Sequence, residues 1–251
     1  MEVILILILL SIISGAIAGL GGSSAFIPIV GLILLTPLTQ TEISGTISTS
    51  FFIATLFGSL LYTLSGDQSK VLLVYIVPSG ILGTQIGVQL NTIISEFVFT
   101  SITATTAIVL GLVLYKNTRL DKTKSQDVTF ERNRFKFWAI LLGLFVGIIA
   151  GVTGIGGIPI IVPALLTLDI DHMTSIATGF TVASFNTFFT SVSYLTQGVV
   201  QVEYVLYIGV PFAVAQIIGW KYAKKIDIDG LKIGISLFNI LLGMYLFSRL
   251  I

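Results

Sequence analysis

The sequence predicts an all-α integral membrane protein built from two inverted-topology repeats of about five hydrophobic segments each. Of the 251 residues, 55% are hydrophobic and only 10% are charged, which is more apolar surface than a water-soluble fold can bury. The uncharged runs Val3–Thr41 and Phe137–Leu168 both exceed the roughly 20 residues that a spanning helix needs. Strict alternation of polar and apolar residues is missing, which favours helices over an outer-membrane barrel.

The sequence predicts ten hydrophobic segments, of which the last five repeat the pattern of the first five. The expected segments are 3–19, 22–36, 44–65, 70–90 and 96–115 in the first half, and 137–153, 156–168, 173–196, 203–222 and 231–249 in the second. An offset of 132 residues relates pairs such as Tyr62 with Tyr194 and Gly87 with Gly219. The glycine motif described below repeats after 135 residues, so we expect a three-residue gap between the second and third segments.

The first two segments of each half are too short for two complete crossings. Phe137–Leu168 must hold both segments and the turn between them, whereas two full spans need roughly 40 residues. We therefore expect short or re-entrant helices that are broken inside the membrane. Such a break is tolerated only where the exposed backbone faces protein or a wet cavity.

The distribution of basic residues predicts the orientation of the chain. Seven of the 13 Lys and Arg residues lie in 116–136, which we interpret as a cytoplasmic linker between repeats at 1–115 and 137–251. Five crossings per half would also place Lys70 and Lys221 on the cytoplasmic side. Because five is an odd number, the second half then starts on the opposite side of the membrane from the first, which favours inverted repeats over parallel ones. We therefore expect a multi-pass protein of the cytoplasmic membrane. The first segment lacks the basic start of a signal peptide and is read as part of the fold.

A duplicated glycine cluster is the main candidate for a binding site. Gly19-Leu20-Gly21-Gly22, followed by Ser23 and Ser24, resembles the later Gly154-Ile155-Gly156-Gly157. Glycines permit a sharp turn, and a helix that starts after one presents free N–H groups and a partial positive charge, which together bind anions. The alternative is that these glycines only allow helices to pack closely.

Polar residues inside the hydrophobic segments could complete this site. The hydroxyls of Thr49, Ser50 and Thr178 could line a polar path, or they could bond their own helix backbone. Four carboxamides are expected to face the bundle interior because an amide is costly to expose to hydrocarbon: Gln85, Gln89, Asn186 and Gln216. Of these we include Asn186 among the substrate-binding residues.

The positions of the ionisable groups argue against several kinds of chemistry. The chain has no cysteine, which excludes disulfides and thiolate metal sites. Acidic residues and the single histidine lie at segment ends, so neither a proton relay nor an intramembrane enzyme is expected. His172 beside Asp169 and Asp171 is weak evidence for a metal site. We predict no cofactor, no metal and no nucleic-acid partner.

The two glycine motifs with Pro28 and Pro163, the Thr49-Ser50 step and the five-plus-five plan resemble the sulfite exporter TauE/SafE family over nearly the whole chain. The sequence departs from the family pattern where Ser23 follows Gly22 and where Gly179 follows Thr178. The resemblance implies a membrane transporter of small sulfur-containing anions such as sulfite or sulfonates.

Together these observations predict a secondary transporter, and specifically an exporter, that works by alternating access with its site near the bilayer midplane. Its partners would be a small anion and the lipid bilayer, and the sequence leaves a homo-oligomer open. An anion channel would share the repeats and the helix ends. A non-transporting membrane scaffold acting through 116–136 is the other alternative.

Overall fold

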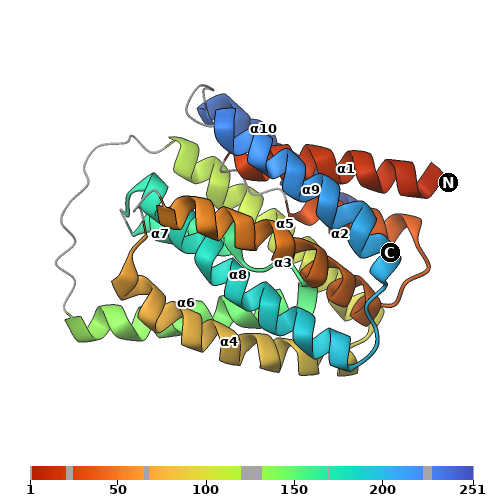
Figure 1. Cartoon of the computed structure of the whole chain (residues 1–251), viewed down its shortest axis with the longest axis horizontal. Coiled ribbons are helices and arrows are strands. Elements are labelled where there is room, and N and C mark those ends of the chain that lie inside the picture. The colour runs from red at the N-terminus through yellow and green to blue at the C-terminus, as the bar shows by residue number, and fades with distance from the viewer. Residues whose placement is uncertain are drawn as a thin grey trace.

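The computed structural model describes residues 2–20, 25–64, 68–119, 132–168, 170–222 and 228–250, and all regular structure within these ranges is α-helical (Figure 1). The helices are α1 (Glu2–Gly19), α2 (Phe26–Leu35), α3 (Gln40–Leu64), α4 (Lys70–Ile93), α5 (Glu96–Arg119), α6 (Arg132–Thr153), α7 (Ile158–Thr167), α8 (His172–Thr196), α9 (Val202–Tyr222) and α10 (Ile228–Ser248). In the described part, six are long and apolar enough to cross a membrane. The predicted all-α integral membrane fold is therefore confirmed.

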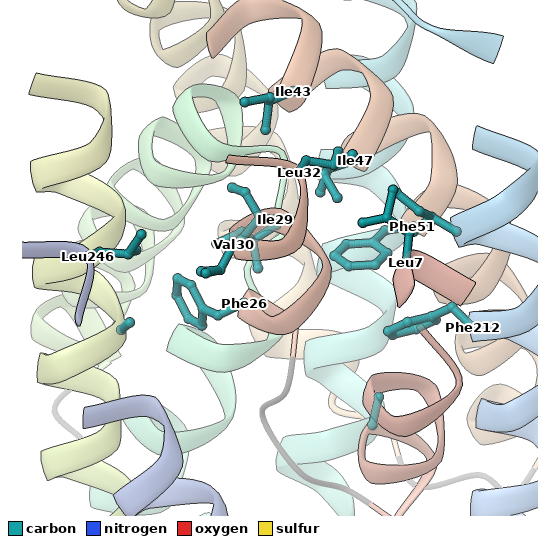
Figure 2. Packing of buried hydrophobic residues seen from close by; sticks show 14 of the residues in the cluster. Leu7, Phe26, Ile29, Val30, Leu32, Ile43, Ile47, Phe51, Phe212 and Leu246 are labelled. Atoms are coloured by element: carbon teal, nitrogen blue, oxygen red, sulfur yellow. The ribbon is translucent and has the colours of Figure 1, made fainter. Parts of the chain in front are cut away.

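The two short helices, α2 and α7, are enclosed by the rest of the protein. Each has 10 residues, so each is about 15 Å long, half of the roughly 30 Å hydrocarbon core. Phe26, Ile29 and Leu32 of α2 are 0% exposed, and Figure 2 shows them among side chains of the neighbouring helices. The buried residues of both helices are concentrated toward the N-terminal end, and this burial shields the free backbone N–H groups there from lipid.

Asp171 is the N-terminal cap of α8. Its Oδ2 accepts hydrogen bonds from the N–H groups of Met173, at 3.0 Å, and Thr174, at 3.2 Å. A carboxylate at this position satisfies donors at the helix start and favours its dipole. Asp169 and the side chain of His172 lie outside the described residues, and the described part contains no cluster of three metal-binding side chains.

The helices of the two halves correspond at one constant offset. Helices α2, α3, α4 and α5 begin at residues 26, 40, 70 and 96, and α7, α8, α9 and α10 begin at 158, 172, 202 and 228, each 132 residues later. The gap that we expected between the second and third segments is therefore wrong. The sequence comparison paired Gly19 with Gly154 because the glycines around them have similar spacing. In the structure the counterpart of Gly19 is Gly151, since these two glycines make the equivalent packing contacts.

Corresponding helices that touch each other run in opposite directions. Along the contact between α3 and α8, the hydroxyl of Thr49 is hydrogen-bonded to that of Ser191, and the hydroxyl of Ser59 to that of Thr181. The residue that comes later in α3 therefore contacts the residue that comes earlier in α8. The α5–α10 contact behaves in the same way, because Gly111 lies against Ile240 and Gly243 against Ala104. This antiparallel arrangement is the one that inverted repeats produce.

The first helix of each half packs on the other half. Helix α1 lies along α9, and α6 lies along α4. Gly15 meets the carbonyl of Phe212, and its counterpart Gly147 meets the carbonyl of Gly80, so closely that a Cβ atom on either glycine would clash with that oxygen. Small residues allow this backbone approach in membrane bundles, and the two halves therefore interlock.

The helix directions place four lysines near one end of the bundle and four glutamates near the other, with Asp171 at the lysine end and Arg249 at the glutamate end. Both termini lie at one end, and α5 finishes and α6 starts at the other (Figure 1). Near the α5–α6 end lie the basic residues Lys70, Lys116, Lys136 and Lys221. The end that holds the termini has acidic residues at its helix starts, namely Glu2, Glu42, Glu96 and Glu203.

A buried tyrosine joins four helices at the end that holds the termini. The Tyr194 hydroxyl donates to the Gly151 carbonyl at 2.8 Å and accepts from Asn91 Nδ2 at 2.7 Å. Asn91 Nδ2 also lies 3.1 Å from Ser44 Oγ, and the Tyr194 and Asn91 side chains are 0% exposed. Removing this hydroxyl would leave buried polar groups without a partner.

We predict that Tyr194→Phe lowers the free energy of unfolding by about 1–3 kcal/mol, the usual effect of an unsatisfied buried group. Thermal unfolding of the purified protein in detergent measures the change. Tyr207→Phe is the matched control, because Tyr207 is half-buried and its hydroxyl has no recorded partner among the described residues. Equal melting temperatures for the two variants would contradict this role of Tyr194.

Candidate substrate-binding site

The turn between α6 and α7 depends on its glycines. Gly154, Gly156 and Gly157 have φ angles of 79°, 77° and 106°, in the left-handed region that other residues rarely adopt. Gly157 precedes the first residue of α7. Within the described part of the chain, no acceptor takes the N–H groups of Gly156 or Gly157, so these donors remain available at the positive end of a buried helix.

Asn186 of α8 holds this turn in place. Its Nδ2 donates to the Gly156 carbonyl at 3.2 Å, and its side chain is 0% exposed. Gly157 lies against the same side chain, near the middle of α8, and against Val146 of α6. Helix α7 therefore begins near mid-height of the bundle, and the prediction that Asn186 faces the interior is confirmed.

A small cavity lies between the two helix breaks. Its volume is about 20 Å³, and it is lined by Ala18, Ala25, Phe51, Thr55, Ile155, Ile158, Pro159, Phe180, Phe212 and Gln216. Ala18 and Ala25 flank the first break, and Ile155 and Ile158 belong to the second. Such a volume holds about one water molecule. The predicted residues Gly21, Gly22, Ser23 and Ser24 lie outside the described residues.

The three predicted hydroxyls do not meet at this cavity. Ser50 Oγ donates to the Thr46 carbonyl of its own helix at 2.7 Å, which is the alternative considered above. Thr178 Oγ1 accepts from the Ser69 N–H at 3.4 Å, near the start of α4. Thr49 Oγ1 lies 2.8 Å from Ser191 Oγ across the α3–α8 contact. Their binding role remains a prediction that these contacts do not support.

Hydroxyl pairs along the α3–α8 contact are the feature that our sequence analysis missed. Thr55 Oγ1 and Thr187 Oγ1 are 3.0 Å apart, and these residues correspond to each other in the two halves. On either side lie two equivalent pairs, Thr49 with Ser191 at 2.8 Å and Thr181 with Ser59 at 3.0 Å. Applying the 132-residue offset to every Ser and Thr would have revealed this symmetry in the sequence.

The carboxamides do not all face the interior. Gln85 and Gln89 are exposed on α4, so that expectation is wrong for both. Gln85 Oε1 accepts a hydrogen bond from Ser193 at 2.9 Å, which reduces the cost of its exposure. Gln216 is 3% exposed, as expected, and lines the cavity between the breaks.

No described charged side chain lines this cavity. The donors and acceptors nearby are backbone groups, hydroxyls and carboxamides. A site of this composition can bind a small polar or singly charged group by hydrogen bonds.

Comparison with known families agrees with the resemblance noted from the glycine motifs. The chain matches the family Sulfite exporter TauE/SafE over residues 3–246. No curated protein and no solved structure gives a significant match. Because the matched region covers nearly all of the 251 residues, this chain is a member of the sulfite exporter TauE/SafE family of membrane transporters.

Proposed function

We propose that this protein exports small sulfur-containing anions such as sulfite or a sulfonate across the cytoplasmic membrane by alternating access. The observation that carries this proposal is the small cavity at mid-height between the two helix breaks. Ile155 and Ile158 line it, and the N–H groups of Gly156 and Gly157, which lie between these two residues in the sequence, have no acceptor in the described part of the chain. The substrate anion would bind there.

Backbone donors suit a transporter that must release its substrate. A helix N-terminus attracts an anion without burying a lysine or arginine, so binding stays weak enough for turnover. A negative-inside potential favours anion export by about 2.3 kcal/mol per charge per 100 mV. Export can therefore proceed without a titrating relay in the membrane.

The relation between the halves supports alternating access. A cavity of about 20 Å³ is too small for a sulfur oxyanion, so the helices must separate for binding. In inverted repeats, the movement that opens one side of the membrane is equivalent to the one that opens the other. We propose that the contact between α3 and α8 separates alternately at its two ends.

The charges at the helix ends support an orientation with both termini outside. Lys70, Lys116, Lys136 and Lys221 would then face the cytoplasm, in agreement with the positive-inside rule. Residues 1–115 and 137–251 would be the two repeats, joined by the cytoplasmic segment 116–136. Helical structure reaches into this segment from both sides, to Arg119 and from Arg132.

Counterflow in liposomes tests the proposed function. Liposomes preloaded with unlabelled sulfite, sulfate, thiosulfate or methanesulfonate receive the labelled anion outside, and we expect transient accumulation for sulfite. Gly157→Ala should lower this rate about tenfold or more, because a Cβ atom there would clash with Val146 at a φ angle of 106°.

Gly198→Ala is the matched control. Gly198 also has a positive φ angle, of 71°, but has nothing within 4 Å of an added Cβ atom, so this variant places a side chain at positive φ without a clash and away from the site. Sulfite flux without counterflow would indicate a channel instead. If none of the anions moves, or if Gly157→Ala matches Gly198→Ala, the proposed function or the proposed site is wrong.

A further inference from the structure

Two buried carboxamides beside the helix breaks each have an oxygen atom without a hydrogen-bond donor. Gln216 Nε2 donates to the Ala54 carbonyl at 3.1 Å, and Asn186 Nδ2 donates to the Gly156 carbonyl at 3.2 Å. Gln216 Oε1 and Asn186 Oδ1 are both buried and have no partner among the described residues. Buried acceptors of this kind are rare in native proteins and require an explanation.

Gln216 lies where a substrate would bind. It lines the same cavity as Thr55, Ile155 and Ile158, and its side chain is 3% exposed. Its amide nitrogen donates one of its two N–H groups to the Ala54 carbonyl, whereas its oxygen has no hydrogen-bond donor among the described residues, so the oxygen is the unsatisfied acceptor at this cavity. This oxygen accepts hydrogen bonds and cannot donate one.

The electrostatics of the cavity disfavour an anion with two negative charges. The basic side chains that the structure describes, Lys70, Lys116, Lys136, Lys221 and Arg249, lie near helix ends and none of them lines the cavity. A dianion would be desolvated without a counter-charge, and its oxygens would face the lone pairs of Gln216 Oε1. An oxyanion that keeps one proton has a single charge and also has an O–H group to donate.

We propose that the site selects the protonated, singly charged form of its oxyanion, with the acidic O–H of the ligand donating to Gln216 Oε1. Gly156 and Gly157 do not themselves line the closed cavity but lie between its lining residues Ile155 and Ile158, and we propose that their free N–H groups donate to the negatively charged oxygens once the helices separate. For sulfite the transported species is hydrogen sulfite. This inference rests on the proposed function and specifies the charge state of its substrate.

The pH dependence of exchange tests the charge state without any variant. Counterflow of labelled sulfite is measured at fixed total concentration, with equal pH on both sides, across the second ionisation of sulfite. We expect the wild-type rate to fall as pH rises, in proportion to the remaining hydrogen sulfite. Sulfate, a dianion throughout, should not compete. A rate that rises with pH, or competition by sulfate equal to that of unlabelled sulfite, would overturn the proposal.

A substitution at Gln216 tests the acceptor. Methanesulfonate has one negative charge but no O–H group, so the wild type should carry it more slowly than hydrogen sulfite. In Gln216→Leu we expect the ratio of the two rates to fall about tenfold, the effect of losing one hydrogen bond. Gln89→Leu, which removes an exposed carboxamide on α4, should leave the ratio unchanged.

The outcomes separate this inference from the function on which it rests. If the wild type carries sulfite but Gln216→Leu keeps the wild-type ratio, only the assigned acceptor is wrong. If the wild type carries neither sulfite nor methanesulfonate, the proposed function fails and this inference fails with it. If Gln216→Leu does not fold, the wild-type pH profile and the sulfate competition still decide the charge state.

Discussion

Oxidising the double variant Thr49→Cys/Ser191→Cys is expected to stop transport almost completely. The two hydroxyl oxygens are 2.8 Å apart across the α3–α8 contact, so we expect cysteines at these positions to bring their sulfur atoms close enough to be oxidised to a disulfide. If transport requires this contact to open, a covalent bond across it holds that side closed. Sulfite counterflow before and after oxidation measures the effect, and reduction should restore the flux.

The chain provides its own controls for this experiment. It has no native cysteine, so no other disulfide can form, and each single cysteine variant should be insensitive to oxidation. The equivalent pair Ser59→Cys/Thr181→Cys tests the other end of the same contact, where the hydroxyls are 3.0 Å apart. Full counterflow in a completely cross-linked sample would refute the proposed separation of α3 and α8.

Gly147→Leu is expected to prevent the two halves from assembling. An added Cβ atom would clash with the Gly80 carbonyl, and backbone atoms of a packed helix cannot move aside as a flexible side chain can. Overpacking usually costs about 1–3 kcal/mol, and we expect at least the upper value here because the whole α4–α6 contact must move apart. The yield of monodisperse protein in detergent and its melting temperature measure the loss.

Gly234→Leu is the matched control for size and hydrophobicity. Gly234 lies in α10 with nothing within 4 Å of an added Cβ atom, so this variant should purify like the wild type. Gly15→Leu, in contrast to this control, is expected to have the same effect as Gly147→Leu, because Gly15 makes the equivalent contact with Phe212. Normal yield and stability of Gly147→Leu would show that the crossing adapts to a larger residue.

Hydrophobicity and glycine placement were sufficient to predict the helices but not their contacts. The short segments 22–36 and 156–168 correspond to α2 (Phe26–Leu35) and α7 (Ile158–Thr167), because lipid requires long apolar runs and glycines interrupt them. The side on which a residue lies depends on helix rotation within the bundle. Gln85 and Gln216 both interrupt apolar helices, yet the first is exposed and the second is buried.

The candidate site was predictable only in part, and for a similar reason. The glycine cluster predicted a sharp turn before a helix start, and Gly156 and Gly157 have positive φ angles there, since a turn is a local property of the chain. Which hydroxyls approach the break depends on the register between α3 and α8, and a single helix contains no information on that register. Ser50 therefore remained a candidate, although its hydroxyl bonds its own helix, whereas Thr55 was not considered.

The exchange of first helices between the halves has a consequence for biosynthesis. Helix α1 packs along α9, and α9 is synthesised only after seven intervening helices have left the ribosome. During that time the contact surface of α1 around Gly15 must be covered by lipid or by a membrane chaperone. Contacts between residues so far apart in sequence form slowly. The N-terminal half therefore cannot complete its fold during translation, and assembly depends on synthesis of the whole chain.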